Sequence, residues 1–402
     1  MLWHYIIVIF KESLKKLWLA GLLIHGLTGH VCAQTQDQTE KIKEEIEEVG
    51  KAKLLHDHEE EPDSLLHSKV QKGFIPIPII ITEPALGGLG GGLAVGYLHT
   101  NRRSLRANTP PTITGVMGGI TRNKTWFVGV GHSHSFLNDH IRYAGGAIKA
   151  NININFYEEL PLIGTIPIGV KLNAWGLVQQ LMFRIKESNV FMGPAYTYIN
   201  TKNRLNQNTD HPLLDSLINT INGTSKLGML GFKIDFDNRD NVLSPNTGIY
   251  AGGNVYYNST IFGGDRNFGI LSLFSKFYVP VSDKVNGAFR FNGQFSQDGI
   301  PFYAKPFVKL RGVPAARYQG NQVMVVETQW RCNFYKSLSV LGFTGTGKAM
   351  DSLEDFGSSD WIYNYGVGAR LALKKLFNLR VGADAAWSNE DFAWYISVGS
   401  SF

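Results

Sequence analysis

The sequence is informative first through what it lacks. Beyond residue 33 it has no run of about 18 apolar residues, the length that a membrane-spanning helix requires, so this part of the chain is not a helical membrane protein. Cysteine is almost absent, with two residues in 402. Only Cys332 follows residue 33, and a single thiol excludes a fold held together by internal disulfides.

Neither sign of charge dominates the chain. It has 39 Lys and Arg against 33 Asp and Glu, a balance that gives no reason to expect a nucleic-acid partner. Glycine and aromatic residues are abundant instead, with 44 glycines and 12% aromatics, whereas glycine averages about 7%. With a mean hydropathy of −0.09, this composition favours many strands with exposed faces over a helical enzyme.

The first 33 residues have the pattern of an export signal. KESLKK supplies the positive region, LWLAGLLIHGLTG the apolar core, and VCA a small-residue cleavage site before Gln34. Cys32 raises the alternative of a lipoprotein, but Val31 stands where a small residue is expected. We therefore expect a signal peptide over 1–33.

Residues 34–72 differ in composition from the rest of the chain. They hold 11 Asp and Glu against six Lys, and too few apolar residues to form a core. We expect an acidic periplasmic tail or a short helix here. The remaining body, 73–402, has 30 basic and 21 acidic residues, a net charge of +9.

The body alternates apolar and polar residues with a period of two. In VNGAFRFNGQFS, for example, Phe289 and Phe291 share one face of a strand and Arg290 lies on the other. A soluble sandwich alternates in the same way. However, export and strands of about ten residues or more are typical of an outer-membrane barrel. Sixteen strands are predicted, at 74–82, 88–99, 112–121, 124–135, 139–155, 166–186, 190–201, 225–237, 247–258, 266–280, 285–297, 322–333, 336–346, 361–373, 377–388 and 392–402.

The connections sort by length into two classes. Those after even-numbered strands are mostly tight, whereas the two longest, 202–224 and 298–321, follow odd-numbered strands. Short periplasmic turns and long external loops are typical of outer-membrane barrels, and an even strand count closes the sheet without a free edge. The predicted fold class is all-β: a 16-stranded antiparallel transmembrane β-barrel over 73–402.

Motifs for nucleotide binding or nucleophilic catalysis are incomplete. Gly342, Gly347 and Lys348 match most of a phosphate loop, but Ala349 replaces the required Ser or Thr. GGLGGG at 87–92 is followed by a strand pattern, where a dinucleotide turn needs a helix. GHSHS at 131–135 lacks the final glycine of a nucleophile elbow. We expect no catalytic residue and no cofactor.

Metal-like motifs are equally weak. His132 and His134 share one face of a predicted strand, where polar wall residues are the simpler interpretation. DFDNRD, from Asp235, has Arg239 in a calcium-ligand position. HDHEEE at 56–61 is a solvated run of charge. We expect no metal site.

One complete motif is DNRDNVLSPNTG, which lies between the eighth and ninth predicted strands. Asp and Asn close turns, proline stiffens them and glycine permits the strand to restart. The string resembles the D-x-R-D-N…P-x-x-G turn of the BamA/TamA family of outer-membrane barrels. The resemblance marks Asp237, Arg239, Asp240, Asn241, Pro245 and Gly248 as motif residues.

The second motif is LRGV, Leu310 to Val313, in the long loop 298–321. It is similar to the loop after the eleventh strand of that family, whose Arg-Gly tip folds back into the barrel and pairs with acids on the inner wall. Gly312 permits a close backbone approach, and Arg311 offers a planar fork to a carboxylate. Glu327, on the polar face of the next strand, is the expected partner. The alternative is a surface loop whose arginines face water.

The sequence departs from the family at several places. Val313 stands where the family usually has an aromatic residue, and Phe343 to Gly347 lacks the acid of the family's F-x-D-x-G. Residues 34–72 are much shorter than one of the periplasmic POTRA domains that the family's assembly members carry. The resemblance therefore covers the barrel and not the part that receives substrates.

The resemblance implies insertion or translocation of proteins at the outer membrane of a Gram-negative bacterium, through a weak seam between the first and last strands, where Phe402 ends the chain. The implied partners are outer-membrane lipid, client outer-membrane proteins and a periplasmic partner chain. One alternative is a passive pore that favours anions, with Arg290 and Arg370 facing inward. Another is a lipid hydrolase using His132 or Ser133.

Overall fold

The computed structural model describes 72–99, 112–160, 164–205, 222–241, 244–335, 337–373, 379–389 and 391–398. The chain divides into two units, Met1–His67 and Ser68–Phe402, and every described residue belongs to the second. The expected signal peptide, the acidic tail apart from Lys72, and the terminal Phe402 lie outside the described residues.

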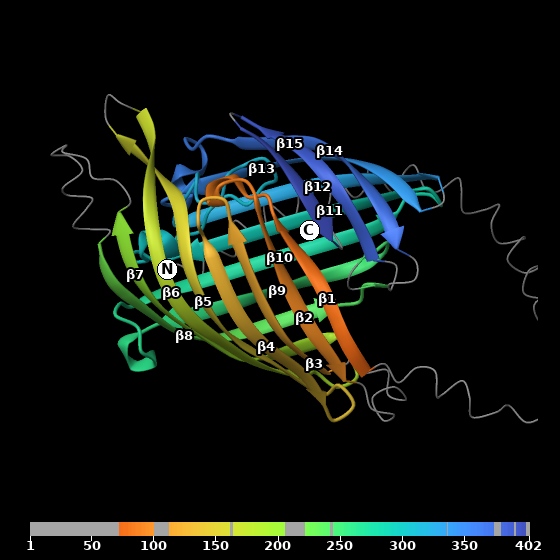
Figure 1. The fold of residues 1–402 in the computed structure, drawn as a ribbon, viewed down its shortest axis with the longest axis horizontal. Helices are drawn as coiled ribbons and strands as arrows, with labels where there is room; N and C mark the ends of the chain where they lie inside the picture. Colours follow the sequence, from red (N-terminus) through yellow and green to blue (C-terminus); the bar gives the residue numbers. More distant parts are fainter. Residues whose placement is uncertain are drawn as a thin grey trace, which may run out of the picture. The chain divides into compact units, whose positions relative to one another are not determined.

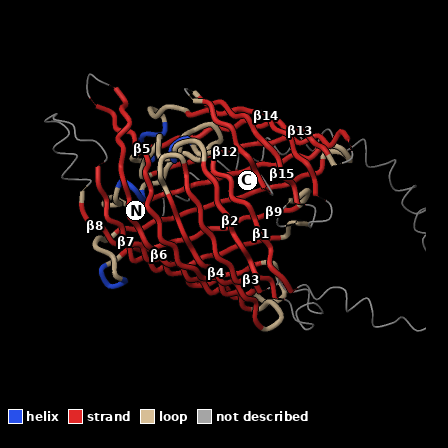
Figure 2. Tube along the Cα trace, viewed as in Figure 1, coloured by secondary structure: helices blue, strands red, loops and turns tan. Residues whose placement is uncertain are grey.

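Strands make up most of the described residues, with only short 3-10 helices in the connections (Figure 2). The strands are β1 Lys72–Ile81, β2 Gly90–His99, β3 Thr112–Thr121, β4 Trp126–Phe136, β5 Ile141–Leu160, β6 Gly164–Arg184, β7 Val190–Leu205, β8 Gly223–Asp237, β9 Gly248–Asn258, β10 Phe268–Pro280, β11 Val285–Ser296, β12 Gln322–Tyr335, β13 Leu338–Met350, β14 Ile362–Leu373, β15 Leu379–Ser388 and β16 Phe392–Val398. The 3-10 helices are η1 Pro84–Leu86, η2 Thr260–Phe262, η3 Phe302–Ala304 and η4 Leu353–Phe356. Among the described residues no helix has the length and apolarity needed to cross a membrane.

All sixteen strands belong to one sheet, and each strand from β1 to β15 pairs antiparallel with the strand that follows it in sequence (Figure 1). The all-β antiparallel class predicted from the alternation is therefore confirmed. The two ends of the order, β1 and β16, approach each other within 8 Å between Cα atoms. No ladder joins them within the part of the chain that the structure describes.

The faces of the sheet are inverted relative to a soluble protein. On β12, Glu327 and Arg331 are buried at 4% and 8% exposure, while Val326 and Trp330 on the other face are 48% and 45% exposed. The exposed face of β11 carries Phe289 at 40%. A large apolar surface facing outward, with charges facing inward, suits contact with lipid.

The predicted strand boundaries differ most from the observed ones in the middle of the chain. The predicted strands 139–155 and 166–186 are observed as β5 and β6, whose ladder continues to the pair Leu160 and Gly164. The predicted strand 190–201 extends to Leu205 as β7. These extensions are held by backbone pairing along the hairpins, which does not need the side-chain alternation on which the prediction depends.

Candidate functional site

The long connection between β11 and β12 forms a loop whose two arms are joined by backbone hydrogen bonds. Val308 N donates to Tyr318 O at 3.0 Å, and Gly320 N donates to Pro306 O at 3.1 Å. Its apolar side chains pack against β12 and β14 in a cluster whose buried members are Val308, Leu310, Val313, Val323, Val325 and Ile362. Val313 thus fills the position of the family's aromatic residue with a buried aliphatic one.

The same loop contacts strands from distant parts of the sheet order. The Tyr303 hydroxyl donates to Ser225 Oγ on β8 at 2.8 Å. The Phe302 ring lies 4.9 Å from the Phe156 ring of β5, centroid to centroid. The loop therefore lies on the face of the sheet that carries the buried charges, and the reading of a solvated surface loop does not fit these contacts.

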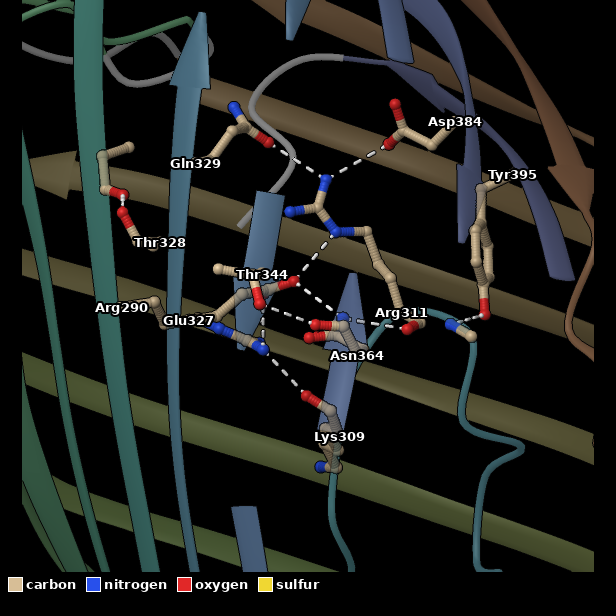
Figure 3. A network of polar contacts seen from close by, with 12 residues as sticks. Arg290, Lys309, Arg311, Glu327, Thr328, Gln329, Thr344, Asn364, Asp384 and Tyr395 are labelled. Carbon is tan, nitrogen blue, oxygen red and sulfur yellow. Dashed lines mark hydrogen bonds and ion pairs between the residues drawn. The ribbon is translucent and has the colours of Figure 1, made fainter. Parts of the chain in front are cut away.

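Arg311, at the tip of the loop, contacts the side chains that the sequence predicts and others that it does not (Figure 3). Its Nε donates to Glu327 Oε1 at 3.0 Å, so the expected contact is present. Its Nη1 donates to Gln329 Oε1 at 3.0 Å and to Asp384 Oδ2 at 3.3 Å. The guanidinium carbon lies 3.5 Å from the centroid of the Phe343 ring, a cation–π contact.

Glu327 binds other side chains besides Arg311. Its other oxygen, Oε2, lies 2.9 Å from Arg290 Nη2, and Asn364 Nδ2 donates to Glu327 Oε1 at 3.3 Å. Arg290 Nη2 also donates to the Lys309 carbonyl at 2.8 Å, which ties the loop backbone to β11. Burial and the neighbouring Arg290 lower the pKa of the Lys309 ammonium.

Asp384 supplies the second acid, which the sequence analysis missed. It lies on β15 and not on β13, where the family's F-x-D-x-G would place it. Arg370 binds it with Nη1 to Oδ1 at 2.6 Å and Nη2 to Oδ2 at 2.7 Å. The signal was available, because Arg380, Gly382 and Asp384 alternate on one face of β15.

These ion pairs correct the interpretation of Arg290 and Arg370 as free inward charges. Arg290 is bound to Glu327, and Arg370, at 2% exposure, is bound to Asp384. Because both guanidinium groups are paired with carboxylates, neither is available to attract a passing anion. Arg290 and Arg370 therefore do not support an anion-selective pore.

Gly312 occupies a position that other residues would strain. Its φ is +89°, and a Cβ here would lie 3.1 Å from the backbone carbon of Trp387 and 3.2 Å from that of Ala386. Gly312 N donates to the Tyr395 hydroxyl on β16 at 2.9 Å. Ser388 Oγ donates to Gly312 O at 3.0 Å. The glycine therefore permits the close approach of the loop to β15 and β16.

The loop also reaches the connection that follows β1. Ala315 N donates to Glu83 Oε1 at 2.9 Å. On the opposite side Arg317 pairs with Asp391, directly before β16. Burial raises the pKa of the Glu83 carboxyl, against the lowering effect of its backbone hydrogen bonds from Ala315 and Ala85. Residues 312–317 thus connect the two ends of the sheet.

β1 itself has an unusual free edge. Pro76 and Pro78 lie opposite Val95 and Leu93 of β2. The Ile79 carbonyl oxygen points to β2, 3.9 Å from the position of a Cβ on Gly91. Peptide groups alternate along a strand, so the nitrogens of both prolines face away from β2 and toward β16. Two positions on that edge therefore have no N–H to donate.

The turn between β8 and β9 is built by the predicted motif residues. Arg239 forms a forked pair with Asp237, with Nε to Oδ1 at 2.8 Å and Nη2 to Oδ2 at 2.7 Å. Gly248 has φ +109°, and a Cβ there would lie 2.7 Å from Arg239 Cα. The structure therefore brings these residues together at the position expected.

Asp240 and Asn241 close the same turn. Asp240 Oδ1 accepts from Asn246 N at 2.9 Å and Thr247 N at 3.2 Å. Burial acts to raise the pKa of Asp240, but these backbone hydrogen bonds hold it below its usual value. Asn241 Oδ1 accepts from Ser244 N at 2.9 Å. Pro245, in the same turn, is buried.

The residues of the incomplete catalytic and nucleotide-binding motifs lie in strands or lead into them. His132 and Ser133 are neighbours on β4 and point to opposite faces of the sheet, so they do not form a nucleophile and base. His132 Nδ1 instead lies 2.8 Å from Thr114 Oγ1. Gly342 and Lys348 lie within β13, and GGLGGG leads into β2, as expected.

Comparison with known proteins supports the region that holds the motif turn at 237–248. Residues 149–308 match the model of the Omp85 superfamily domain. The superfamily resemblance inferred from the sequence is therefore confirmed over this region. Curated protein sequences gave no match.

Solved structures share the fold at low sequence identity. BamA from Haemophilus ducreyi lacking POTRA domains 1-3 has a TM-score of 0.56 and 13% identity, over 82% of this chain and 70% of that chain. CdiB from Acinetobacter baumannii has a TM-score of 0.54 and 11% identity, over 81% and 59%. CdiB from Escherichia coli has a TM-score of 0.55 and 12% identity, over 81% and 62%. Because this chain covers less than two thirds of either CdiB, their activities do not transfer directly.

Proposed function

We propose that this chain forms a closed outer-membrane β-barrel that inserts or translocates other proteins through the seam between β1 and β16. The matched Omp85 superfamily domain and the structural likeness to BamA and CdiB support the class. The outward apolar face of the strands supports location in the outer membrane of a Gram-negative bacterium. In this proposal the loop between β11 and β12 lies in the barrel lumen.

The observation that carries the proposal is the weakness of the seam. A continuous ladder would hold β1 and β16 together, but Pro76 and Pro78 remove two donors from the edge of β1 that faces β16. The loop connects the two sides instead, through Glu83 after β1 and through Tyr395 and Asp391 at β16. A few side-chain contacts separate more readily than a full ladder, so an incoming strand could pair with the exposed edge.

The motif turn fits the same scheme as a structural element. Its forked Asp237–Arg239 pair and its closing Asp240 hold β8 and β9 at the end of the sheet opposite the loop. The implied partners are outer-membrane lipid, client outer-membrane proteins and a periplasmic chain that receives clients. No enzyme activity is part of the proposal.

Cross-linking the loop to both sides of the seam tests the mechanism. In a Cys332→Ser background, one cysteine pair replaces Glu83 and Ala315, and a second replaces Arg317 and Asp391. A short bis-maleimide then links each pair in purified protein reconstituted into phospholipid vesicles. The measurement is the folding of a urea-denatured outer-membrane barrel into the vesicles, followed by heat-modifiable mobility on a gel.

Each single cross-link is the matched control, because it ties the loop to one side of the seam and leaves the other side free. We expect both links together to abolish insertion and either link alone to leave it. Equal insertion by the doubly linked and unlinked proteins would contradict the proposal. Steady conductance in planar bilayers, with no insertion by the unlinked protein, would favour the passive pore.

A further inference from the structure

A second cluster of arginines lies away from the loop tip, under the turn between β8 and β9. Asn246 Oδ1 accepts from Arg331 Nη2 at 2.6 Å and from Arg380 Nη2 at 3.2 Å. Two guanidinium groups from β12 and β15 therefore share one neutral amide oxygen. Arg331 Nη2 also donates to Asn286 Oδ1 at 3.0 Å, and Arg380 Nη1 donates to Ser244 O at 3.3 Å. Every one of these acceptors is uncharged.

The carboxylates nearby are already engaged. Asp384 is bound by Arg370 and Arg311. Asp240 faces its own turn and accepts from Asn246 and Thr247. Arg331 is only 8% exposed, and the Nε atoms of both Arg331 and Arg380 are buried without a hydrogen-bond partner. The charge of Asp240 acts on both arginines from a distance, but the described hydrogen-bond acceptors of both guanidinium groups are neutral. Burying a cation with no anion in direct contact is costly, so the cluster calls for a second anion.

A cavity lies beside these donors. Its volume is about 20 Å³, and its lining includes Ser244, Asn246, Asn286, Arg331, Arg370 and Arg380. One water needs roughly 10–15 Å³, so the space is sufficient for one small ion and too small for an organic anion. Size, charge and unused N–H groups all point to the same kind of ligand.

We propose that this cavity is a binding site for a monoatomic inorganic anion of the chloride class, held by the guanidinium groups of Arg331 and Arg380. The anion adds a negative charge in direct contact with both guanidinium groups and so joins the β8–β9 turn to β12 and β15. The site is separate from the β1–β16 seam, and the proposal holds whether or not the chain inserts proteins.

Stability in different salts tests the site in the purified full chain. Heating followed by tryptophan fluorescence gives the unfolding temperature in sodium chloride and in sodium gluconate at equal ionic strength. Gluconate is too large for the cavity, so we expect a higher unfolding temperature in chloride, with an effect that saturates. Arg331→Gln and Arg380→Gln should each lose this chloride-dependent shift. Arg122→Gln, at an exposed turn, is the matched control and should keep it.

Crystals of the wild-type chain soaked in bromide give a second measurement that does not depend on the variants folding. We expect an anomalous peak between Arg331 and Arg380. The proposal is overturned by equal unfolding temperatures of the wild type in the two salts. It is also overturned by full retention of the shift in both cluster variants, or by a water without anomalous signal in the cavity.

Discussion

Arg311 and Asp384 lie 73 positions apart in the sequence, and the arginine Nη1 donates to the aspartate Oδ2 at 3.3 Å. Glu327 binds the same guanidinium through Nε, so acids from β15 and β12 meet on one loop residue. Each acid also holds a second arginine, Arg370 or Arg290. Three cations thus share two anions, and the effects of mutations within this network will not add.

The network predicts that Glu327→Gln is more damaging than Arg311→Ala. Losing Glu327 leaves the three buried arginines of the network with Asp384 as its one remaining acid, which should lower the free energy of unfolding by about 3–5 kcal/mol. Losing Arg311 leaves each acid with its other arginine, at a cost nearer to 1.5–3 kcal/mol, about the worth of charged hydrogen bonds. Urea unfolding in lipid vesicles measures both.

The control for this pair is Asp351→Asn, which removes an exposed partner 3.8 Å from Lys305. It should change the free energy of unfolding by less than about 1 kcal/mol. A larger loss in Arg311→Ala than in Glu327→Gln would show that the arginine, and not the acid, organises the network.

Gly312→Ala should destabilise the docked loop by about 1–3 kcal/mol, because alanine at φ +89° is strained and its Cβ would press on the backbone of β15. Gly357→Ala is the control, since Gly357 has φ −75° and no atom within 4 Å of a Cβ. Protease cleavage of the loop, compared between the two variants, reports the docking. Equal cleavage of both variants would mean that Gly312 can be replaced freely.

Restoring N–H groups on the free edge of β1 should strengthen the seam. In Pro76→Val combined with Pro78→Val, up to two backbone hydrogen bonds can form toward β16, at about 0.5–1.5 kcal/mol each. We expect higher resistance to urea and slower insertion of a client barrel. Pro280→Val, at the exposed end of β10, should change neither. Faster insertion by the double variant would argue against a seam that must open.

Glu83 gives the stability a defined pH dependence. Burial raises its pKa in the folded state, so folding favours the protonated carboxyl. The stability that the protonated Glu83 carboxyl contributes is fully present below the pKa of the unfolded state, near 4.5. This stability is lost as the pH rises through the higher pKa of the folded state. Glu83→Gln should therefore match the wild type at low pH and equal or exceed its stability at pH 7. If Glu83→Gln were less stable than the wild type at pH 7, the pKa of Glu83 would be lowered by folding and not raised.

The sequence predicts the strands wherever one face meets lipid and the other meets buried polar groups. Val285 to Ser296 has such alternation and was predicted to within one residue. The end of β5 and the start of β6 were not predicted. Glu158 and Glu159 continue the β5–β6 ladder there, although two consecutive acids break the alternation of apolar and polar residues. Backbone pairing leaves no trace in side-chain periodicity.

At the candidate site, local motifs were readable and long-range partners were not. Arg311, Gly312 and Glu327 stand close in sequence, and the resemblance marks their roles. Asp384 and Tyr395 join the site only because the sheet brings β15 and β16 to the loop. An inward acid on β15 was visible in the alternation, but nothing in one sequence says which strand lies opposite the loop tip.

The bond between Ala315 and Glu83 closes a chain segment of 232 residues. Contacts this distant in sequence form late, since the entropy of closing so long a segment must be offset by strands already in place. Docking of the loop therefore comes after β1 and β16 have been brought near each other. The sheet with its loop undocked is the expected last intermediate in the folding of the chain, and loop docking is the step that completes the native state.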